Sequence, residues 1–382
     1  MKMQEYIEKK KEFYDSLLEF LENIEYDVDY FQGFIKIIKQ EKLEDDCQEF
    51  EEFLRLLNNI INYHHRNENF IIKVEQIFDY FSVFILKNFT NLSIFNIFKN
   101  NKIVLYILIT RKIIVLDNDI IKVLFLENDS LTKNICQFFF PEIQQVVKES
   151  LPIEYLVVGK KKIEKIEKDL LSQDENIFNN FDQKRKIGEN DSYICSLIRQ
   201  DSIEEFVSYV NRTNYSISSE IKYSIFETNL FLIESNPTLI EYAAFFGSIQ
   251  IFQYLKFNGV ELNSNLWKYS IHSQNSELIH FLEISQILPP NKQYEECLKE
   301  SIKCHHNDIA NYIENNFITE NELYQKEDFF SMILCYRNFS FFPSEFGKSD
   351  EFFYLCKYNY NKLVKLFLET KAEYFISYDN VY

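Results

Sequence analysis

The sequence predicts an all-α protein that ends in stacked helix pairs, and three observations carry this prediction. Six glycines and six prolines make up only 12 of the 382 residues, about 3% against about 12% in ordinary chains, so few residues suit the many tight turns of sandwiches and barrels. Apolar residues recur at the i, i+3, i+4 spacing of amphipathic helices. A two-helix pattern also returns several times in the second half of the chain, which is typical of helical repeat proteins.

In the first half of the chain, the spacing of apolar residues predicts a series of helices. Residues 13–21 carry their apolar side chains on one face, and residues 44–63 form a second amphipathic stripe. Residues 70–86 continue the pattern. The prolines at positions 141 and 152 bracket a further short helix, because proline is tolerated only near a helix start.

The clearest two-helix unit lies at residues 238–263. Its first helix carries a pair of alanines, whose small side chains allow close packing, and a glycine turn leads into a second helix with one apolar stripe. A glycine after that helix suits the left-handed conformation that ends many helices. The repeat-defining positions are Ala243, Ala244, Gly247, Ile251, Leu255, Gly259 and Asn263.

This unit recurs along the second half of the chain. Ser270 and then Ser301 take the place of Ala243, each followed by a second apolar stripe. Weaker copies lie at residues 194–210, 329–342 and 363–367. Each pair would bury its apolar face only against its neighbours, so we predict a stacked α-solenoid of five or six helix pairs.

The unit resembles the ankyrin repeat, which has a threonine before its first helix, an alanine pair within it, a glycine at the turn, and a glycine and an asparagine after its second helix. Thr238 and the repeat-defining positions carry the resemblance, whereas the proline and histidine of the family's opening box are absent and Ser248 replaces the usual turn histidine. The other units match only in their apolar positions and are shorter than the ordinary ankyrin unit. The resemblance covers residues 194–368 and implies an ankyrin-like solenoid with shortened loops. The whole chain looks similar to protist ankyrin-repeat proteins with a divergent helical N-terminal region.

We expect two regions in the chain. Residues 172–192, rich in Asn, Asp, Gln, Ser and Lys, are the best candidate for a linker. A helical N-terminal region is therefore expected at residues 1–185 and an ankyrin-repeat domain at residues 190–382. Residues 103–107 echo the second helix of the repeat, which leaves open an array that begins near residue 90.

Charge and targeting signals bear on the partner and on the compartment. Lys and Arg number 41 against 59 Asp and Glu, a net charge of −18, so we expect no nucleic acid and no membrane as a partner, and a basic protein is favoured. The longest apolar run, residues 103–109, is too short to span a bilayer, and the first ten residues lack the apolar core of a secretory signal. Seven scattered cysteines indicate reduced thiols and a cytoplasmic location. The basic triplet at residues 184–186 leaves nuclear entry open.

The sequence carries no recognised catalytic or cofactor-binding motif. Its six glycines are isolated, so no phosphate-binding loop is predicted. The sharpest metal candidate is Cys297 with Cys304, His305 and His306, because zinc favours cysteine and histidine. In the repeat register the two histidines occupy the turn between helices, so we interpret the group as a capped turn and expect no metal site. A cysteine nucleophile would need a histidine beside it in space, which a sequence does not exclude, but we expect no cofactor and no enzyme activity.

The predicted function is that of a non-catalytic protein-binding module. In the ankyrin pattern the positions after the alanine pair line the concave groove and meet the partner, and by resemblance that role falls to Phe245, Phe246, His272, Ser273, Lys303 and Cys304. Burial of the two phenylalanines against neighbouring helices is the alternative interpretation of that pair. Two other functions stay open: an adaptor whose N-terminal region engages cellular machinery while the repeats hold a client, and an enzyme with a cryptic site in the first half.

Overall fold

The computed structural model is helical, as the composition predicts. It describes residues 2–23, 28–66, 69–127, 129–149, 153–318, 327–342 and 349–379. Across these ranges the structure has 23 α-helices and is 75% helical. Within the described residues there is no strand, and the one extended pairing is an isolated antiparallel bridge between Glu220 and Thr238. The all-α prediction is confirmed.

The chain divides into two compact units, each assembled from separate stretches of sequence. Unit 1 comprises Met1–Val74, Ala244–Gly247 and Glu261–Tyr382, and unit 2 comprises Glu75–Ala243 and Ser248–Val260. Two helices, α4 (Phe70–Asn88) and α15 (Leu239–Phe246), contribute residues to both units. The chain therefore passes between the units four times.

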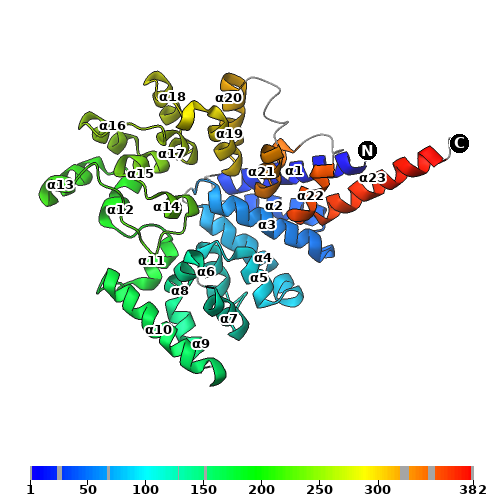
Figure 1. The fold of residues 1–382 in the computed structure, drawn as a ribbon, viewed down its shortest axis with the longest axis horizontal. Coiled ribbons are helices and arrows are strands. Elements are labelled where there is room, and N and C mark those ends of the chain that lie inside the picture. Colours follow the sequence, from blue (N-terminus) through cyan, green and yellow to red (C-terminus); the bar gives the residue numbers. More distant parts are fainter. Residues whose placement is uncertain are drawn as a thin grey trace. The chain divides into compact units, whose positions relative to one another are not determined.

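Unit 1 contains the helices of both ends of the chain. Its N-terminal helices are α1 (Lys2–Glu22), α2 (Val28–Glu41), the 3-10 helix η1 (Leu43–Asp45) and α3 (Cys47–Tyr63). Its C-terminal helices are α17 (Leu266–His272), α18 (Ser276–Ile284), η2 (Pro290–Lys292), α19 (Tyr294–Lys303), α20 (Asn307–Phe317), α21 (Glu327–Tyr336), η3 (Phe339–Phe341), α22 (Ser349–Lys357) and α23 (Asn361–Asp379). Helix α1 contacts both η3 and α23, so the two ends of the described chain pack together (Figure 1).

Unit 2 contains the helices of the middle of the chain. They are α5 (Asn91–Phe98), α6 (Lys102–Thr110), α7 (Asn118–Leu126), α8 (Ser130–Phe138), α9 (Phe140–Glu149), α10 (Ile153–Gln173), α11 (Phe181–Ile187), α12 (Tyr193–Arg199), α13 (Ile203–Thr213), α14 (Leu230–Ser235) and α16 (Ile249–Phe257). Residues 103–108 of the apolar run that the sequence shows at 103–109 are buried in α6, in the interior of the unit. Among the described residues, no helix combines the length and the apolar character that crossing a bilayer requires.

Successive helix pairs in unit 1 pack in series. Helix α17 contacts α18, and α19 contacts α20. Helix α19 also contacts α17 on one side of the series and α21 on the other. The turns within three pairs share one backbone feature, because Gly247, Gln274 and His305 have positive φ angles of 68°, 56° and 60°. These turns recur at the spacing that the sequence pattern predicts. Two of these turns are closed by the residue that follows. The backbone N–H of Ser248 donates to the carbonyl of Ala243, and the backbone N–H of His306 donates to the carbonyl of Ser301.

A buried lysine closes the C-terminal end of α1. The side chain of Lys73 is 1% exposed, and its ammonium group donates hydrogen bonds to the backbone carbonyls of Phe20, at 2.8 Å, and of Asn23. A cation suits this position, because the last carbonyls of a helix have no partner within the helix and carry partial negative charge. Lys73 thereby fastens α4 to α1.

A half-buried carboxyl group near the start of α3 makes the stability of unit 1 depend on pH. Burial raises the pKa of Glu52 to about 7, with Glu49 adding to the rise and Arg337 opposing it. Between pH 4.5 and pH 7 the folded chain thus keeps a proton that the unfolded chain has lost, so this group makes the fold less stable as pH rises through that window. We expect Glu52→Gln to raise the free energy of unfolding at pH 8 by about 1–3 kcal/mol and to change it little at pH 4. Urea unfolding at the two pH values measures the difference.

The neighbouring Glu51 is the matched control for this prediction. Its carboxylate forms a surface pair with Arg55, which contributes only about 0.5 kcal/mol. Glu51→Gln should therefore be neutral or slightly destabilising at both pH values. A Glu52→Gln variant that loses stability at pH 8 would show that the ionised carboxylate is well accommodated.

Candidate functional site

The positions that the repeat register assigns to a binding groove do form a row in unit 1. The rings of Phe245 and His272 stack with their centroids 5.1 Å apart. The Sγ atom of Cys304 lies 3.4 and 3.5 Å from the two nitrogens of His272. Side chains from α15, from α17 and from the turn after α19 therefore lie next to one another.

The row is buried rather than open to a partner. The exposed fractions of Phe245, His272, Ser273 and Cys304 are 6%, 1%, 7% and 0%, and Phe246 and Lys303 are half-buried. These side chains offer little surface in the described structure. A role in partner binding stays a prediction for them, and burial, the alternative for the two phenylalanines, describes Phe245.

The end of α3 covers part of this row. The ammonium group of Lys303 lies over the ring of Tyr63, 4.8 Å from its centroid, and the ring of Tyr63 meets that of Tyr336 edge-on at 5.3 Å. His64, the next residue, has its Nδ1 atom 2.9 Å from the carbonyl oxygen of Cys304. The N-terminal helices thus fill space that a concave groove would leave to a partner.

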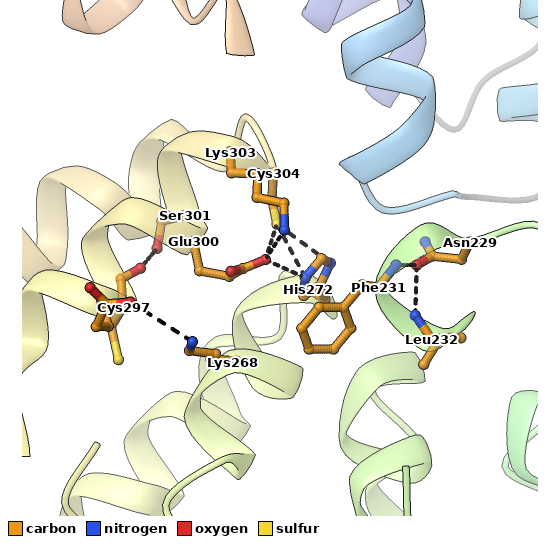
Figure 2. A network of polar contacts seen from close by, with 11 residues as sticks. Asn229, Phe231, Leu232, Lys268, His272, Cys297, Glu300, Ser301, Lys303 and Cys304 are labelled. Atoms are coloured by element: carbon orange, nitrogen blue, oxygen red, sulfur yellow. Dashed lines mark hydrogen bonds and ion pairs between the residues drawn. The ribbon is translucent and has the colours of Figure 1, made fainter. Parts of the chain in front are cut away.

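At the centre of the row lies a cluster of three side chains from α17 and α19 and the turn that follows α19. Glu300 places Oε1 2.9 Å from the Nε2 atom of His272 and 4.0 Å from the Sγ atom of Cys304. Lys303 pairs with the same carboxylate oxygen at 3.2 Å. Figure 2 shows these four side chains converging, with Cys297 apart from them. We call His272, Glu300 and Cys304 the buried triad.

Electrostatics favour an ionised carboxylate and a neutral thiol in the buried triad. Burial alone would raise the pKa of Glu300, but the close contact with the His272 ring and then the charge of Lys303 outweigh it and lower that pKa to about 2. Burial, followed by the nearby carboxylate, raises the pKa of the Cys304 thiol well above its usual value. Lys303 supplies the cation that keeps Glu300 charged.

Five of the six histidines of the chain gather in and around the buried triad. His305 has its Nδ1 atom 2.9 Å from the hydroxyl of Tyr14, and the rings of His64 and His306 lie 4.7 Å apart. Burial lowers the pKa of His305 and of His306 well below the usual range. His65 follows the same trend, with a pKa of about 4 caused by burial and then by its neighbours His64 and His272. Only His280, on α18, is exposed.

The sequence grouped Cys297, Cys304, His305 and His306 as a metal candidate and interpreted them as a turn. The structure places His305 and His306 in the turn between α19 and α20, as that interpretation expects. It separates Cys297 from Cys304 and joins Cys304 instead to His272 and Glu300 (Figure 2). Sequence reasoning missed Glu300, whose only signal was a position one turn before Cys304 on the same helix.

The order cysteine, histidine, carboxylate also suits a nucleophile and its base, but this geometry does not serve that chemistry. Cys304 is fully buried, and its raised thiol pKa keeps the thiolate population low. Its sulfur is equally far from both nitrogens of His272, so neither nitrogen is aligned to take the thiol proton. A substrate would have no surface through which to reach the sulfur.

A groove runs over the surface of unit 1 between α18 and α20. One hollow of about 550 Å³ is lined by apolar Ile279 and Ile309 and by the carboxylates of Glu283 and Asp308. A second hollow, of about 670 Å³, shares Glu283 and Tyr312 with the first, so the two adjoin. Apolar side chains and acidic groups both line these adjoining hollows, which we together call the α18–α20 groove.

The residues that the sequence analysis takes as repeat-defining lie in α15, in α16 and in the turns and loop beside these helices. Ala243 and Ala244 are fully buried in α15, and Ile251 and Leu255 are fully buried in α16. Gly247 and Gly259 both adopt positive φ. Asn263 accepts a hydrogen bond from the backbone N–H of Asn265 at 2.9 Å, which orders the loop before α17.

Unit 2 carries a hollow of its own. It measures about 540 Å³ and lies among α7, α8 and α10. Its walls mix acidic and basic side chains, including Asp129, Asp169, Lys133 and Lys165.

Comparison of the chain with protein-family models, with curated proteins and with solved structures gave no match. The likeness to ankyrin repeats therefore rests on the residue pattern and on the packing of helix pairs described above.

Proposed function

We propose that the protein is a non-catalytic protein-binding module whose α18–α20 groove holds a basic, amphipathic segment of a partner. The observation that carries this proposal is the groove itself, which offers apolar walls and two carboxylates along one depression. Leu288, 48% exposed, and Tyr312, 41% exposed, add accessible apolar surface. Exposed apolar patches rimmed by charge are typical of interaction sites.

The charge of the chain supports a basic partner. The net charge of −18 attracts cations at long range and speeds their encounter at low salt. Within the groove, Glu283 and Asp308 would pair with lysine or arginine side chains, while Leu288 and Ile309 would pack against apolar ones. A helix with apolar residues at i, i+3 and i+4 and basic residues between them meets both demands.

We also propose that the helix pairs of the second half of the chain belong to an ankyrin-like solenoid. The recurring turns and the serial packing of α17, α19 and α21 support an ankyrin-like solenoid with shortened loops. A cytoplasmic setting is supported by seven cysteines that are all free, since disulfides are rare in reducing compartments. One basic feature weighs against nuclear import, because Arg185 in the triplet 184–186 is 4% exposed.

The groove is tested with full-length protein and a library of displayed peptides. The variant Leu288→Ser/Asp308→Asn removes one apolar contact and one charge without adding bulk to the groove. Wild-type protein should select peptides rich in lysine, arginine and apolar residues at helical spacing. The variant should bind the selected peptides at least tenfold more weakly, about 1.4 kcal/mol, when measured by titration calorimetry.

The control carries matched changes on the other unit. Phe257, 80% exposed on α16, and the exposed Glu205 on α13 are replaced in Phe257→Ser/Glu205→Gln. This variant should bind the selected peptides as tightly as wild type does. If both variants bind the peptides equally weakly, or if both bind them as tightly as wild type does, the peptides bind to a different surface.

The hollow of unit 2 supports a second candidate function, that of an adaptor. An adaptor would engage cellular machinery through the first half of the chain while the α18–α20 groove holds the client. Lys133→Gln/Lys165→Gln on unit 2 and the groove variant should then each lose a different set of captured proteins. One shared set of losses would favour the simple binding module.

A further inference from the structure

The buried triad brings together three kinds of atom that bind transition metals. His272 offers an imidazole nitrogen, Glu300 a carboxylate oxygen and Cys304 a sulfur, and all of these atoms lie within 4.8 Å of one another. The three side chains are almost completely buried. A mixed set of nitrogen, oxygen and sulfur ligands is typical of zinc sites in proteins.

The separations within the buried triad are close to those around one tetrahedral ion. With metal–sulfur bonds of about 2.3 Å and metal–nitrogen or metal–oxygen bonds of about 2.0–2.2 Å, neighbouring ligand atoms stand about 3.3–3.6 Å apart. The Sγ atom of Cys304 is 3.5 Å from Nε2 of His272 and 4.0 Å from Oε1 of Glu300, and those last two atoms are 2.9 Å apart. Shifts of about half an ångström would bring all three to ligand distance, which flexible side chains can supply.

The surroundings of His272 fit the role of a ligand. The backbone carbonyl of Tyr63 accepts a hydrogen bond from the imidazole ring, and Glu300 presents an oxygen to Nε2. A neutral imidazole has a single N–H, so it serves only one of these two acceptors. Metal-bound histidines use their N–H in this way, donating to a carbonyl while the other nitrogen holds the ion.

Lys303 is the cation that pairs with Oε1 of Glu300, the oxygen that faces His272 and Cys304. Its ammonium lies 3.2 Å from Oε1 and also faces the rings of Tyr63 and Tyr336, 4.8 and 5.9 Å from their centroids. These aromatic faces stabilise the lysine without help from the carboxylate. Lys303 can therefore yield Oε1 to an ion and keep a favourable position.

We infer that His272, Glu300 and Cys304 form a binding site for one divalent transition-metal ion of the zinc class. The ion would join α17 to α19 and leave its fourth coordination position to a water molecule. Binding replaces the thiol proton of Cys304, which passes to solvent, and the resulting thiolate and the carboxylate balance the two charges of the ion. Because the site is enclosed, the ion would enter as the chain folds. The inference is independent of the α18–α20 groove.

Cobalt provides the test, since Co²⁺ replaces zinc in such sites and is coloured. Full-length protein purified with a chelator is unfolded, refolded in the presence of Co²⁺ and then titrated with Zn²⁺. We expect one ion per chain, a thiolate-to-cobalt charge-transfer band in the near ultraviolet, visible bands of four-coordinate intensity, and loss of all these bands on addition of Zn²⁺. Cys304→Ser should remove the charge-transfer band and weaken Zn²⁺ binding at least tenfold.

Two controls from the same unit separate this site from incidental binding. Cys297→Ser replaces another fully buried cysteine of α19, and His280→Gln replaces the exposed histidine of α18. Both variants should keep the band and the affinity of wild type. If Cys304→Ser does not fold, the wild-type titration decides alone, in a background where the exposed Cys47 and Cys356 are serine. Folded protein that shows no thiolate band with excess Co²⁺, or a band that survives Cys304→Ser, would overturn the inference and leave an ion-pair network.

Discussion

Replacing Arg185 with methionine is expected to destabilise unit 2 by about 2–4 kcal/mol, because it removes the buried cation of an ion-pair network. The guanidinium group pairs with Glu142 at 2.7 Å and with Asp182 at 2.8 Å. It also donates to the carbonyl of Phe138 at 3.2 Å. Methionine preserves the apolar stem but leaves the Phe138 carbonyl without this donor and Glu142 without this counter-charge. Urea unfolding followed by circular dichroism measures the loss.

Lys186, one residue later, is the control for Arg185. It is exposed, so Lys186→Met should change the free energy of unfolding by no more than about 0.5 kcal/mol. The double variant Glu142→Gln/Arg185→Met should lose less than the sum of its single changes, since the two side chains interact directly. An Arg185→Met protein as stable as Lys186→Met would mean that the network contributes nothing.

Ala243→Asp is expected to cost about 3–5 kcal/mol, because it buries a charge that has no partner. Ala243 is fully buried in α15, and its carbonyl accepts the N–H of Ser248 that closes the turn at Gly247. Aspartate at this position must either stay unpaired or push the helices apart. The melting temperature and the helical circular dichroism signal should both fall.

An exposed position of the same helix pair provides the comparison for Ala243. Gln253 lies on the outer face of α16, and Gln253→Asp should cost about 0.5 kcal/mol through lower helix propensity alone. If Ala243→Asp has the same melting temperature as Gln253→Asp, the alanine pair does not lie at a tight helix–helix contact. The repeat register built on that pair would then be wrong.

Local periodicity was sufficient to predict several of the helices and the turns between the clearest helix pairs. Residues 44–63 and 70–86 were expected to be helical, and α3 and α4 cover almost the same ranges. The turn at His305 was expected from its alignment with Gly247, and both residues adopt positive φ. Apolar spacing and turn position depend on neighbouring residues, so a single sequence reveals them.

Periodicity did not predict which polar side chains are buried. Lys73 lies within an amphipathic helix, where a lysine usually marks the solvated face, yet it is buried because it meets the end of α1. The predicted binding row is likewise covered by Tyr63 and His64, which belong to the first quarter of the chain and lie far from His272 in sequence. Contacts between such distant residues leave no periodic signal.

Unit 1 is assembled from segments at both ends of the chain, and this affects how it folds during synthesis on the ribosome. Residues 1–74 emerge first and α1 can pack against α2 at once, but the other parts of unit 1, at residues 261–382, appear only after the whole middle of the chain has been synthesised. At about 5–20 residues per second, the surface of α1 that η3 and α23 cover in the folded protein stays exposed for roughly ten seconds or longer. Nascent chains of this protein should therefore depend on chaperones during translation, and fragments that stop near residue 185 should aggregate.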